Sequence, residues 1–344
     1  MRRVVLSSCL AAGVVAAVLA PSSRVVATER VSAPPAAAAK LKLLWSEEFN
    51  NKRGLPPTVH ITGLRDSSKF NWNTEVTSRP NNRERQYYTD GVVQFNRNGS
   101  IAHWAIELDG KGNLVINAMR PQRAVKGKHR GTIPPDTCYY GPCEFLSGRI
   151  NTKDRLSFLY GQIQARMRIP EGAGTWPAFW MLGSNIDDVN WPSCGELDIM
   201  EAAGTPERAG SIFGSLHSFP DDGFGLTSSE YPDDLYSKYH IFGVRWVKDR
   251  IDWLLDGKVF FSMTRREATA NYNAVWSELL GETLNREWPF NKKMFLILNL
   301  AMGGTLGGDG DNDFAAPEGA TGGQFAIDWI RYYSVNGQGT LIRE

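Results

Sequence analysis

The chain has 344 residues, of which 42% are hydrophobic, 22% charged and 11% aromatic, as in an ordinary globular protein. This hydrophobic fraction excludes wholesale disorder, and a formal net charge of +1 argues against a broad electrostatic surface for nucleic acid or membrane. The 34 glycines, 11 tryptophans, 11 tyrosines and 16 phenylalanines indicate many turns and many flat aromatic surfaces, a mixture common in β-rich proteins.

Residues 1–27 have the layout of a secretory signal peptide. Arg2 and Arg3 precede an uncharged run over residues 4–20, and Val25-Val26-Ala27 offers a cleavage site. A membrane anchor is the alternative reading, but a run this short is marginal for spanning about 30 Å of hydrocarbon. Cleavage removes three arginines and no acid, leaving 35 basic and 37 acidic residues. We therefore expect a secreted, extracellular protein with no membrane attachment after cleavage and an uncharged partner.

Beyond the signal, the sequence predicts one domain. Residues 28–40 form a Pro/Ala linker, residues 41–336 continue without a second linker or repeat, and residues 337–344 are expected to be a C-terminal tail. Strand character recurs in eleven stretches: Leu43–Phe49, Asn113–Ala118, Tyr160–Ile169, Ala178–Leu182, Glu196–Glu201, Ser211–His217, His240–Trp246, Arg250–Leu255, Lys258–Ser262, Met294–Ala301 and Phe325–Tyr333.

Local patterns within these stretches favour antiparallel β-structure. Ile163, Ala165, Met167 and Ile169 share one face of their stretch, and Asp256-Gly257 is a tight hairpin signal. Only Glu267–Leu284 resembles a short helix. Many strands with glycine-rich turns and one helix favour an all-β antiparallel sandwich over an α/β fold.

Three cysteines remain after signal cleavage: Cys138, Cys143 and Cys194. Cys138 and Cys143 bracket Tyr-Tyr-Gly-Pro, a turn sequence that can bring their Cα atoms within bridging distance. In an oxidising compartment we expect a small-loop disulfide there. Cys194 has no predicted partner.

The chemistry concentrates in Gly195-Glu-Leu-Asp-Ile-Met-Glu201. On a regular strand Glu196 and Asp198 share one face, but Met200 occupies the next position on that face. A β-bulge with Met200 as the inserted residue would return Glu201 to the side of the other two acids. A solvated acidic patch is the alternative, yet this strand is otherwise apolar and aromatic segments precede it. We interpret the three carboxylates as a catalytic site.

Paired carboxylates of this kind suit glycoside hydrolysis. Two carboxyl groups about 5–5.5 Å apart serve a retaining mechanism, one as nucleophile and the other as acid/base. Asp198 between the glutamates can hold a proton or a hydrogen bond that keeps their pKa values apart. We also expect the charge of Glu196 and partial burial to raise the pKa of Glu201.

The segment resembles the E-[I/L]-D-[I/F]-x-E signature of glycoside hydrolase family sixteen, in the form with an inserted bulge residue. Further matches to laminarinase-type members run in order over about residues 41–336: Trp176-Pro-Ala-Phe-Trp-Met-Leu-Gly183, Trp45-Ser-Glu-Glu-Phe49, Gln86-Tyr-Tyr-Thr89, Gly112-Asn-Leu-Val-Ile116, Phe295-Leu-Ile-Leu-Asn-Leu-Ala-Met-Gly-Gly304 and Asp328-Trp-Ile-Arg-Tyr-Tyr333. The resemblance implies a β-jelly-roll sandwich of two curved antiparallel sheets with a concave substrate cleft.

The resemblance also implies roles. Glu196 matches the nucleophile, Asp198 the assisting acid and Glu201 the general acid/base of endo-hydrolysis of β-1,3- or mixed-linkage β-glucan. The residues expected to bind substrate are Trp176, Trp180, Trp191, His217, Asn82 and Arg85, with core packing as the alternative for the tryptophans and a structural role for His217. Residues 81–86 are an arginine-rich version of the segment that borders the sugar cleft in relatives, which affects subsite preference more than mechanism.

Glu48 and Asp328 fall where many relatives hold a structural calcium ion, partly through backbone oxygens, and calcium takes hard oxygen ligands. No cofactor is expected to be required for catalysis. The expected partner is a β-glucan polysaccharide, bound by a monomer that takes neither nucleic acid nor membrane. A non-catalytic glucan-recognition protein and a hydrolase of another polysaccharide, such as a galactan, are the alternative functions; retention of both glutamates favours the enzyme.

Overall fold

The computed structural model describes residues 39–50, 71–96, 101–121, 138–204, 211–218, 224–227, 232–269, 288–308, 315 and 318–344. All of them belong to one compact unit of the chain, Ala39–Glu344. The expected signal peptide (1–27) and nearly all of the expected linker lie outside the described residues. No helix in the described part of the chain is both long and apolar enough to cross a membrane.

The larger of the two main sheets has ten strands and contains the long β20. Its neighbours are antiparallel except for β3 and β8, which run parallel. The strands in spatial order are β18 (Lys258–Thr264), β17 (Arg250–Leu255), β16 (His240–Val247), β11 (Gly161–Arg168), β20 (Gly322–Val335), β7 (Leu114–Met119), β8 (Phe145–Ser147) and β3 (Gln86–Tyr88), with β1 (Leu41–Glu47) paired to β20 and β6 (Ile106–Leu108) paired to β7.

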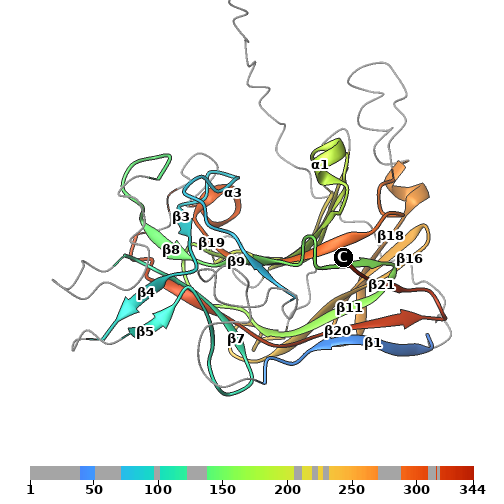
Figure 1. The fold of residues 1–344 in the computed structure, drawn as a ribbon, viewed down its shortest axis with the longest axis horizontal. Coiled ribbons are helices and arrows are strands. Elements are labelled where there is room, and N and C mark those ends of the chain that lie inside the picture. The colour runs from blue at the N-terminus through green and yellow to red at the C-terminus, as the bar shows by residue number, and fades with distance from the viewer. Residues whose placement is uncertain are drawn as a thin grey trace, which may run out of the picture. The chain divides into compact units, whose positions relative to one another are not determined.

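The second sheet has nine antiparallel strands and stacks on the first (Figure 1). Its strands in spatial order are β15 (Phe224–Thr227), β14 (Ile212–His217), β13 (Glu196–Ala202), β12 (Thr175–Gly183), β19 (Met294–Met302), β10 (Leu156–Leu159) and β21 (Thr340–Arg343), with β9 (Arg149–Asn151) joining β19 to β2 (Asn73–Thr74). The remaining elements are the pair β4 (Val92–Phe95) and β5 (Ile101–Trp104), and the short helices α1 (Ile186–Val189) and α3 (Gly304–Gly307). Figure 1 shows α1 and α3 on the same side of the nine-stranded sheet, away from the ten-stranded one.

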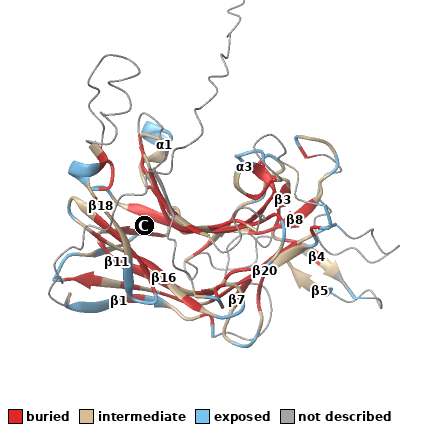
Figure 2. Cartoon of the chain, turned by 180° about the vertical axis from the view of Figure 1, so that it is seen from behind, coloured by how far each residue is buried: buried red, intermediate tan, exposed pale blue. Residues whose placement is uncertain are grey.

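The hydrophobic core lies between the two sheets, and strand alternation decides which side chains enter it. In β11, Ile163, Ala165 and Met167 are fully buried in the core, as their alternation predicts, whereas Arg166 and Arg168 are only half-buried. Figure 2 shows the buried residues concentrated along the strands of both layers. In β12 and β19 the same alternation sends every second side chain to the core and the others to the outer face of the nine-stranded sheet.

The all-β sandwich predicted from the sequence is confirmed. Each of the eleven predicted strand stretches contains a strand, and the hairpin turn at Asp256-Gly257 joins β17 to β18 with positive φ at both residues. Residues 265–269 are helical, near the beginning of the helix expected over Glu267–Leu284, whose remainder lies outside the described residues. The strands missed by the sequence analysis are mostly of two to four residues, too short to show a period.

The expected C-terminal tail is instead part of the fold. Residues Thr340–Arg343 form β21, which pairs antiparallel with β10. Leu341 packs against the core, and the Glu344 carboxylate accepts hydrogen bonds from Ser157 Oγ and Lys293 Nζ. A four-residue strand at the edge of a sheet is defined by its partner strand and not by its own pattern, so position in the sequence alone suggested a tail.

Candidate active site

The three acidic residues of β13 lie on the outer face of the nine-stranded sheet. Leu197, Ile199 and Met200 from the same strand belong to the core cluster on the opposite side. Across the sheet, the register places Leu182 beside Glu196, Trp180 beside Asp198 and Ala178 beside Glu201. The outer face therefore carries one row of carboxylates next to a row that includes the tryptophan side chains of β12.

A β-bulge in β13 produces this arrangement. Against β14 the register runs from Asp198↔Ser215 directly to Glu201↔Phe213, so that two residues of β13 face Gly214 alone. Against β12, Met200 pairs with Phe179 and Asp198 pairs with Trp180, which leaves Ile199 as the unpaired residue. The predicted bulge is confirmed, but its inserted residue opposite β12 is Ile199 instead of Met200.

A tryptophan from the core forms a hydrogen bond with the backbone at the bulge. The indole N–H of Trp253 on β17 crosses between the sheets and donates a 2.8 Å hydrogen bond to the carbonyl oxygen of Asp198. The bulge disturbs the regular β-ladder here, and this bond gives the carbonyl of Asp198 a buried donor. A Cβ atom on Gly214 would lie 2.3 Å from Trp253 Nε1, so only glycine leaves room for the indole. Neither Trp253 nor Gly214 can be linked to the bulge from the sequence, because they lie 55 and 16 positions after Asp198 in the chain.

Glu196 is held by an indole from the loop that precedes it. Trp191 Nε1 donates a 2.5 Å hydrogen bond to Glu196 Oε2. Burial and the negative charge of Asp198 raise the pKa of Glu196 to about 8, and the nearby His217 and the Trp191 bond oppose this rise. The ionised form of Glu196 is therefore stabilised by two neighbours, Trp191 and His217.

Glu201 accepts a hydrogen bond from a different tryptophan. Trp176 Nε1 on β12 donates a 2.8 Å hydrogen bond to Glu201 Oε1, and Trp176 is itself buried, with 7% of its surface exposed. Burial, followed by the charge of Asp198, raises the pKa of Glu201 to about 8. The expectation that the charge of Glu196 would be a leading cause is wrong, since Asp198 is the principal acidic neighbour of both glutamates. The expectation that Asp198 keeps the two pKa values apart is also wrong, because its charge raises both of them to about 8.

Asp198 lies between the glutamates and beside His217. His217 Nε2 is 3.3 Å from Asp198 Oδ2. In the pairing of β13 with β14, His217 of β14 lies opposite Glu196 of β13. Asp198 is only 3% exposed, and its Oδ2 makes no aligned hydrogen bond within the described residues. A buried carboxylate oxygen in this state is suited to share a proton or to accept a hydrogen bond from a ligand.

Glu196, Asp198 and His217 are also the group with metal-ligand chemistry among the described residues. One ligand atom from each lies within 4.8 Å of the others. Trp191 already donates a hydrogen bond to Glu196 and lies beside the His217 ring, and His217 Nε2 lies 3.3 Å from Asp198 Oδ2.

A polar network beside the site was not predicted. Glu84, only 5% exposed, accepts hydrogen bonds from Gln86 Nε2 (2.5 Å) and Tyr88 Oη (3.0 Å). Tyr88 Oη in turn accepts a bond from Asn299 Nδ2, and Asn299 Oδ1 accepts one from Trp180 Nε1. Burial raises the pKa of Glu84, and its charge contributes to the raised pKa of Glu201. The network fixes Trp180, half-buried beside Asp198. Two members of the network, Glu84 and Gln86, lie in the segment 81–86 that the sequence analysis placed at the sugar cleft.

Asn82 and Arg85 of that segment occupy different surroundings. The carbonyl oxygen of Asn82 accepts a bond from Thr305 N in α3. The guanidinium of Arg85 pairs with Glu144 and stacks over Tyr140 at 3.6 Å. Of the predicted substrate-binding residues, the structure brings the three tryptophans and His217 to the carboxylates and their neighbours. Arg85 is instead engaged with the 138–144 loop.

The predicted disulfide between Cys138 and Cys143 closes that loop, with an S–S distance of 2.06 Å. Cys194 is a free, fully buried thiol next to Gly195. Gly195 has a φ of +83°, and a Cβ there would lie 2.6 Å from Pro289. The chain thus enters β13 through a turn that requires glycine, directly before Glu196.

The side chains of Glu48 and Asp328, which were expected near a structural calcium ion, are both paired with arginines. Arg331 donates two hydrogen bonds to the Glu48 carboxylate, at 2.9 and 3.0 Å, and Arg166 donates one to Asp328 at 2.5 Å. The bonds from Arg331 hold the pKa of Glu48 below its ordinary value. A guanidinium on each carboxylate supplies the positive charge that a calcium ion would otherwise bring.

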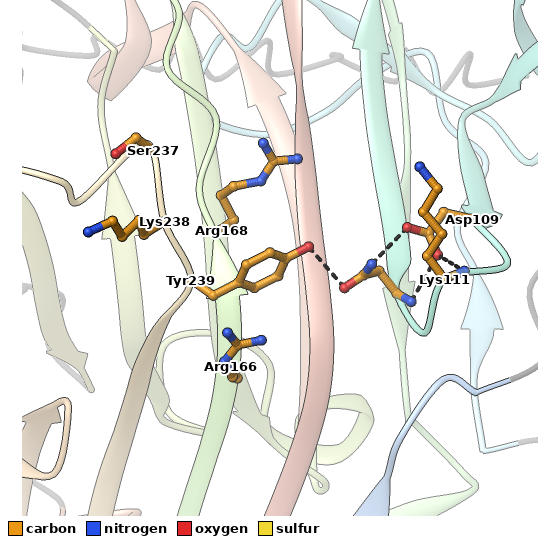
Figure 3. A pocket seen from close by; sticks show the side chains of 8 residues that line it. Asp109, Lys111, Arg166, Arg168, Ser237, Lys238 and Tyr239 are labelled. Carbon is orange, nitrogen blue, oxygen red and sulfur yellow. Dashed lines mark hydrogen bonds between the residues drawn. The ribbon is translucent and has the colours of Figure 1, made fainter.

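A hollow of about 500 Å³ lies elsewhere, on the outer face of the ten-stranded sheet (Figure 3). Its lining residues are Asp109, Lys111, Asn113, Arg166, Arg168, Ser237, Lys238 and Tyr239. Tyr239 Oη donates a hydrogen bond to Asn113, and the side chain and backbone of Asn113 donate to Asp109. Asp109 is its one acidic lining residue and is already bonded, so the hollow lacks a carboxylate pair for glycoside chemistry.

Comparisons with known proteins show which family this chain resembles. The family model "Glycosyl hydrolases family 16" matches residues 128–331. The glucan endo-1,3-beta-glucosidase A1 of Niallia circulans is 32% identical over 309 residues, which cover 86% of this chain but only 38% of that protein. The glucan endo-1,3-beta-glucosidase of Cryptopygus antarcticus is 32% identical over 299 residues, covering 85% of this chain and 92% of that protein.

The fold is shared with solved laminarinases. The laminarinase catalytic domain from Thermotoga maritima superimposes with a TM-score of 0.59 at 28% identity, covering 86% of this chain and 98% of that domain. The predicted jelly-roll sandwich is therefore confirmed. The family model matches more than half of the chain and includes all of β13, so the chain belongs to the glycosyl hydrolases of family 16.

Proposed function

We propose that this protein is a secreted endo-β-glucanase that cleaves β-1,3-glucan, or mixed-linkage β-1,3-1,4-glucan, with retention of configuration. One observation carries the proposal: Glu196 and Glu201 lie on one face of β13 on either side of Asp198, and each accepts a hydrogen bond from an indole. The printed names of the two relatives with 32% identity favour the β-1,3 linkage.

In the first step, an oxygen of the Glu196 carboxylate attacks the anomeric carbon as the glycosidic bond breaks. Glu201 gives its proton to the leaving oxygen, which departs as a neutral hydroxyl. Glu196 and Glu201 both have raised pKa values and interact, so they lose their protons one after the other, and near neutral pH the pair keeps the second proton, which Glu201 can donate. The product of this step is a glycosyl ester on Glu196.

In the second step, Glu201 acts as a base. Glu196 has lost its charge in the ester, and Glu201, now ionised, takes a proton from a water molecule that attacks the anomeric carbon. The ester bond breaks, and Glu196 returns as a carboxylate. Asp198 and His217, 3.3 Å apart, accommodate the change of charge on Glu196 because both lie next to it.

The other parts of the proposal rest on the sequence. Residues 1–27 direct secretion, a polysaccharide partner suits a near-neutral chain, and the protein acts as a monomer without a cofactor in the reaction. These properties are accessible to size-exclusion chromatography of the secreted protein and to activity assays after exhaustive chelation.

The substrate and stereochemistry can be tested together. The purified protein is incubated with laminarin, lichenan, agarose and carrageenan, the products are sized, and the anomer formed first is identified by proton NMR. We expect internal cleavage of laminarin or lichenan and initial release of the β-anomer, because two inversions restore the configuration. Initial α-anomer, or binding of laminarin without cleavage, would contradict the proposal.

The bulge offers a second test. Deleting Met200 removes one of the two residues opposite Gly214, so the bulge is lost and strict alternation returns. Glu201 would then follow Ile199 directly on a regular strand, which moves its carboxylate away from its present place. We expect a loss of at least about 10²-fold in kcat/KM on laminarin, because misplacement by about 1 Å can cost that much. The matched control is Met200→Leu, which keeps the chain length and nearly the volume and should stay close to wild type. Normal activity in the deletion variant would show that the bulge does not place Glu201.

A further inference from the structure

Each proposed catalytic glutamate is bonded to one tryptophan, but the two tryptophans differ in setting. Trp176 is 7% exposed and forms part of β12, whereas Trp191 is 45% exposed and lies in the loop between α1 and β13. An indole N–H is a donor only, so each contact favours an acceptor oxygen on its glutamate. Trp176 was expected as a sugar-binding residue, and so was Trp191, but neither bond to a glutamate was expected.

The loop fixes Trp191 over the glutamate from several points. The backbone N–H of Asn190 donates to the carbonyl of Ile186, that of Cys194 to the carbonyl of Asn190, and that of Gly195 to the carbonyl of Pro192. The Trp191 ring also lies 6.2 Å from the His217 ring, tilted by 43°. The indole thus has a defined place above Glu196 although nearly half of its surface is open to solvent.

We propose that Trp191 is a positioning residue for the nucleophile: its N–H donates a hydrogen bond to Oε2 of Glu196, which leaves Oε1 as the oxygen that attacks the anomeric carbon. This inference rests on the proposed function and adds a role that ring stacking on a sugar does not supply. In the glycosyl ester, Oε1 carries the sugar and Oε2 becomes the carbonyl oxygen, which still accepts the indole bond. The contact persists through both steps, and no proton or electron pair leaves Trp191.

The charge balance of the site gives this bond a second consequence. Burial, Asp198 and Glu201 all oppose ionisation of Glu196, whereas His217 and the hydrogen bond from Trp191 favour it. Removing the indole N–H should therefore raise the pKa at which Glu196 ionises and move the acid limb of the pH profile upward. A tryptophan that only stacks on a sugar would change KM and leave that limb in place.

The test replaces Trp191 without removing its ring. Trp191→Phe keeps an aromatic face and deletes the donor; incorporation of β-(3-benzothienyl)alanine at position 191 keeps the bicyclic shape and replaces N–H by sulfur. We expect kcat on laminarin to fall by about 10- to 100-fold in both, with the acid limb of kcat/KM shifted up by about one pH unit. KM should change little. Trp104→Phe in β5 is the matched control and should leave kcat, KM and the pH profile unchanged.

Two further measurements keep the outcomes separate. Circular dichroism and the thermal midpoint exclude misfolding, and the bicyclic variant covers the case in which phenylalanine disturbs the loop. An unshifted acid limb with raised KM would overturn the inference in favour of stacking, while cleavage of laminarin by the wild type and its loss in Glu196→Gln would leave the proposed function standing. If the wild type itself does not cleave laminarin or lichenan, the proposed function fails first.

Discussion

Glu196→Gln is expected to reduce turnover of β-glucan by about 10⁴-fold or more, as loss of the nucleophile does in other hydrolases with covalent intermediates. The amide has nearly the same volume as the carboxylate, but it is a poor nucleophile. Its oxygen can still accept the hydrogen bond from Trp191 Nε1, which lies 2.5 Å from Glu196 Oε2. The fold and the binding of glucan should therefore be nearly unchanged, as measured by circular dichroism and isothermal titration calorimetry.

A smaller side chain at the same position makes the assignment sharper. In Glu196→Ala or Glu196→Gly, azide can enter the space of the carboxylate and attack the anomeric carbon of an activated aryl glycoside. We expect rescue of the rate and a glycosyl azide of inverted configuration, identified by NMR. Full glucanase activity in Glu196→Gln would remove Glu196 from the role of nucleophile.

Glu201→Ala should separate substrates by their leaving groups. A natural glucan leaves as an alcohol that needs a proton, whereas dinitrophenolate leaves without one. We expect a loss of about 10²- to 10⁴-fold on laminarin and a much smaller loss in the glycosylation step of a dinitrophenyl glycoside. Equal losses on both substrates would show that Glu201 is not the general acid.

The pH dependence follows from the same carboxyl group. Burial and the charge of Asp198 raise the pKa of Glu201 and of Glu196 alike to about 8, so the interacting pair loses a first proton at lower pH and a second one, which the first step needs, at higher pH. The wild-type profile should be bell-shaped, with its acid limb reporting mainly Glu196 and its alkaline limb mainly Glu201. Because the carboxylates interact, both limbs belong to the coupled group. In Glu201→Ala the alkaline limb should flatten; an unchanged limb would assign it to another residue.

Several features of the fold were predictable because they depend on local patterns. Alternation in Gly161–Arg168 identified the core residues Ile163, Ala165 and Met167, and Asp256-Gly257 identified a hairpin. The expected disulfide needed only a five-residue separation and a turn sequence. Short edge strands such as β21 were missed because two to four residues carry no period, and their pairing depends on a partner far away in the chain.

The site was predictable in part for the same reason. Since side chains alternate along a strand, the spacing of Glu196, Asp198 and Glu201 required a bulge if all three were to share a face. The spacing could not say which residue is unpaired, because that depends on the registers with β12 and β14. These registers leave Ile199 opposite no residue of β12, and they place the bulge at Gly214, where Trp253 needs the space.

The sequence by itself determined the all-β class, the carboxylates and their shared face, because each of these is encoded by neighbours a few positions apart. Only the tertiary structure decided the partners of the acidic residues: an indole for each catalytic glutamate, a histidine for Asp198, and arginines for Glu48 and Asp328. The physical reason is that hydrogen bonds and pKa values depend on distances of about 3 Å between atoms. Such distances arise when strands far apart in the chain pair in a fixed register, which no local pattern contains.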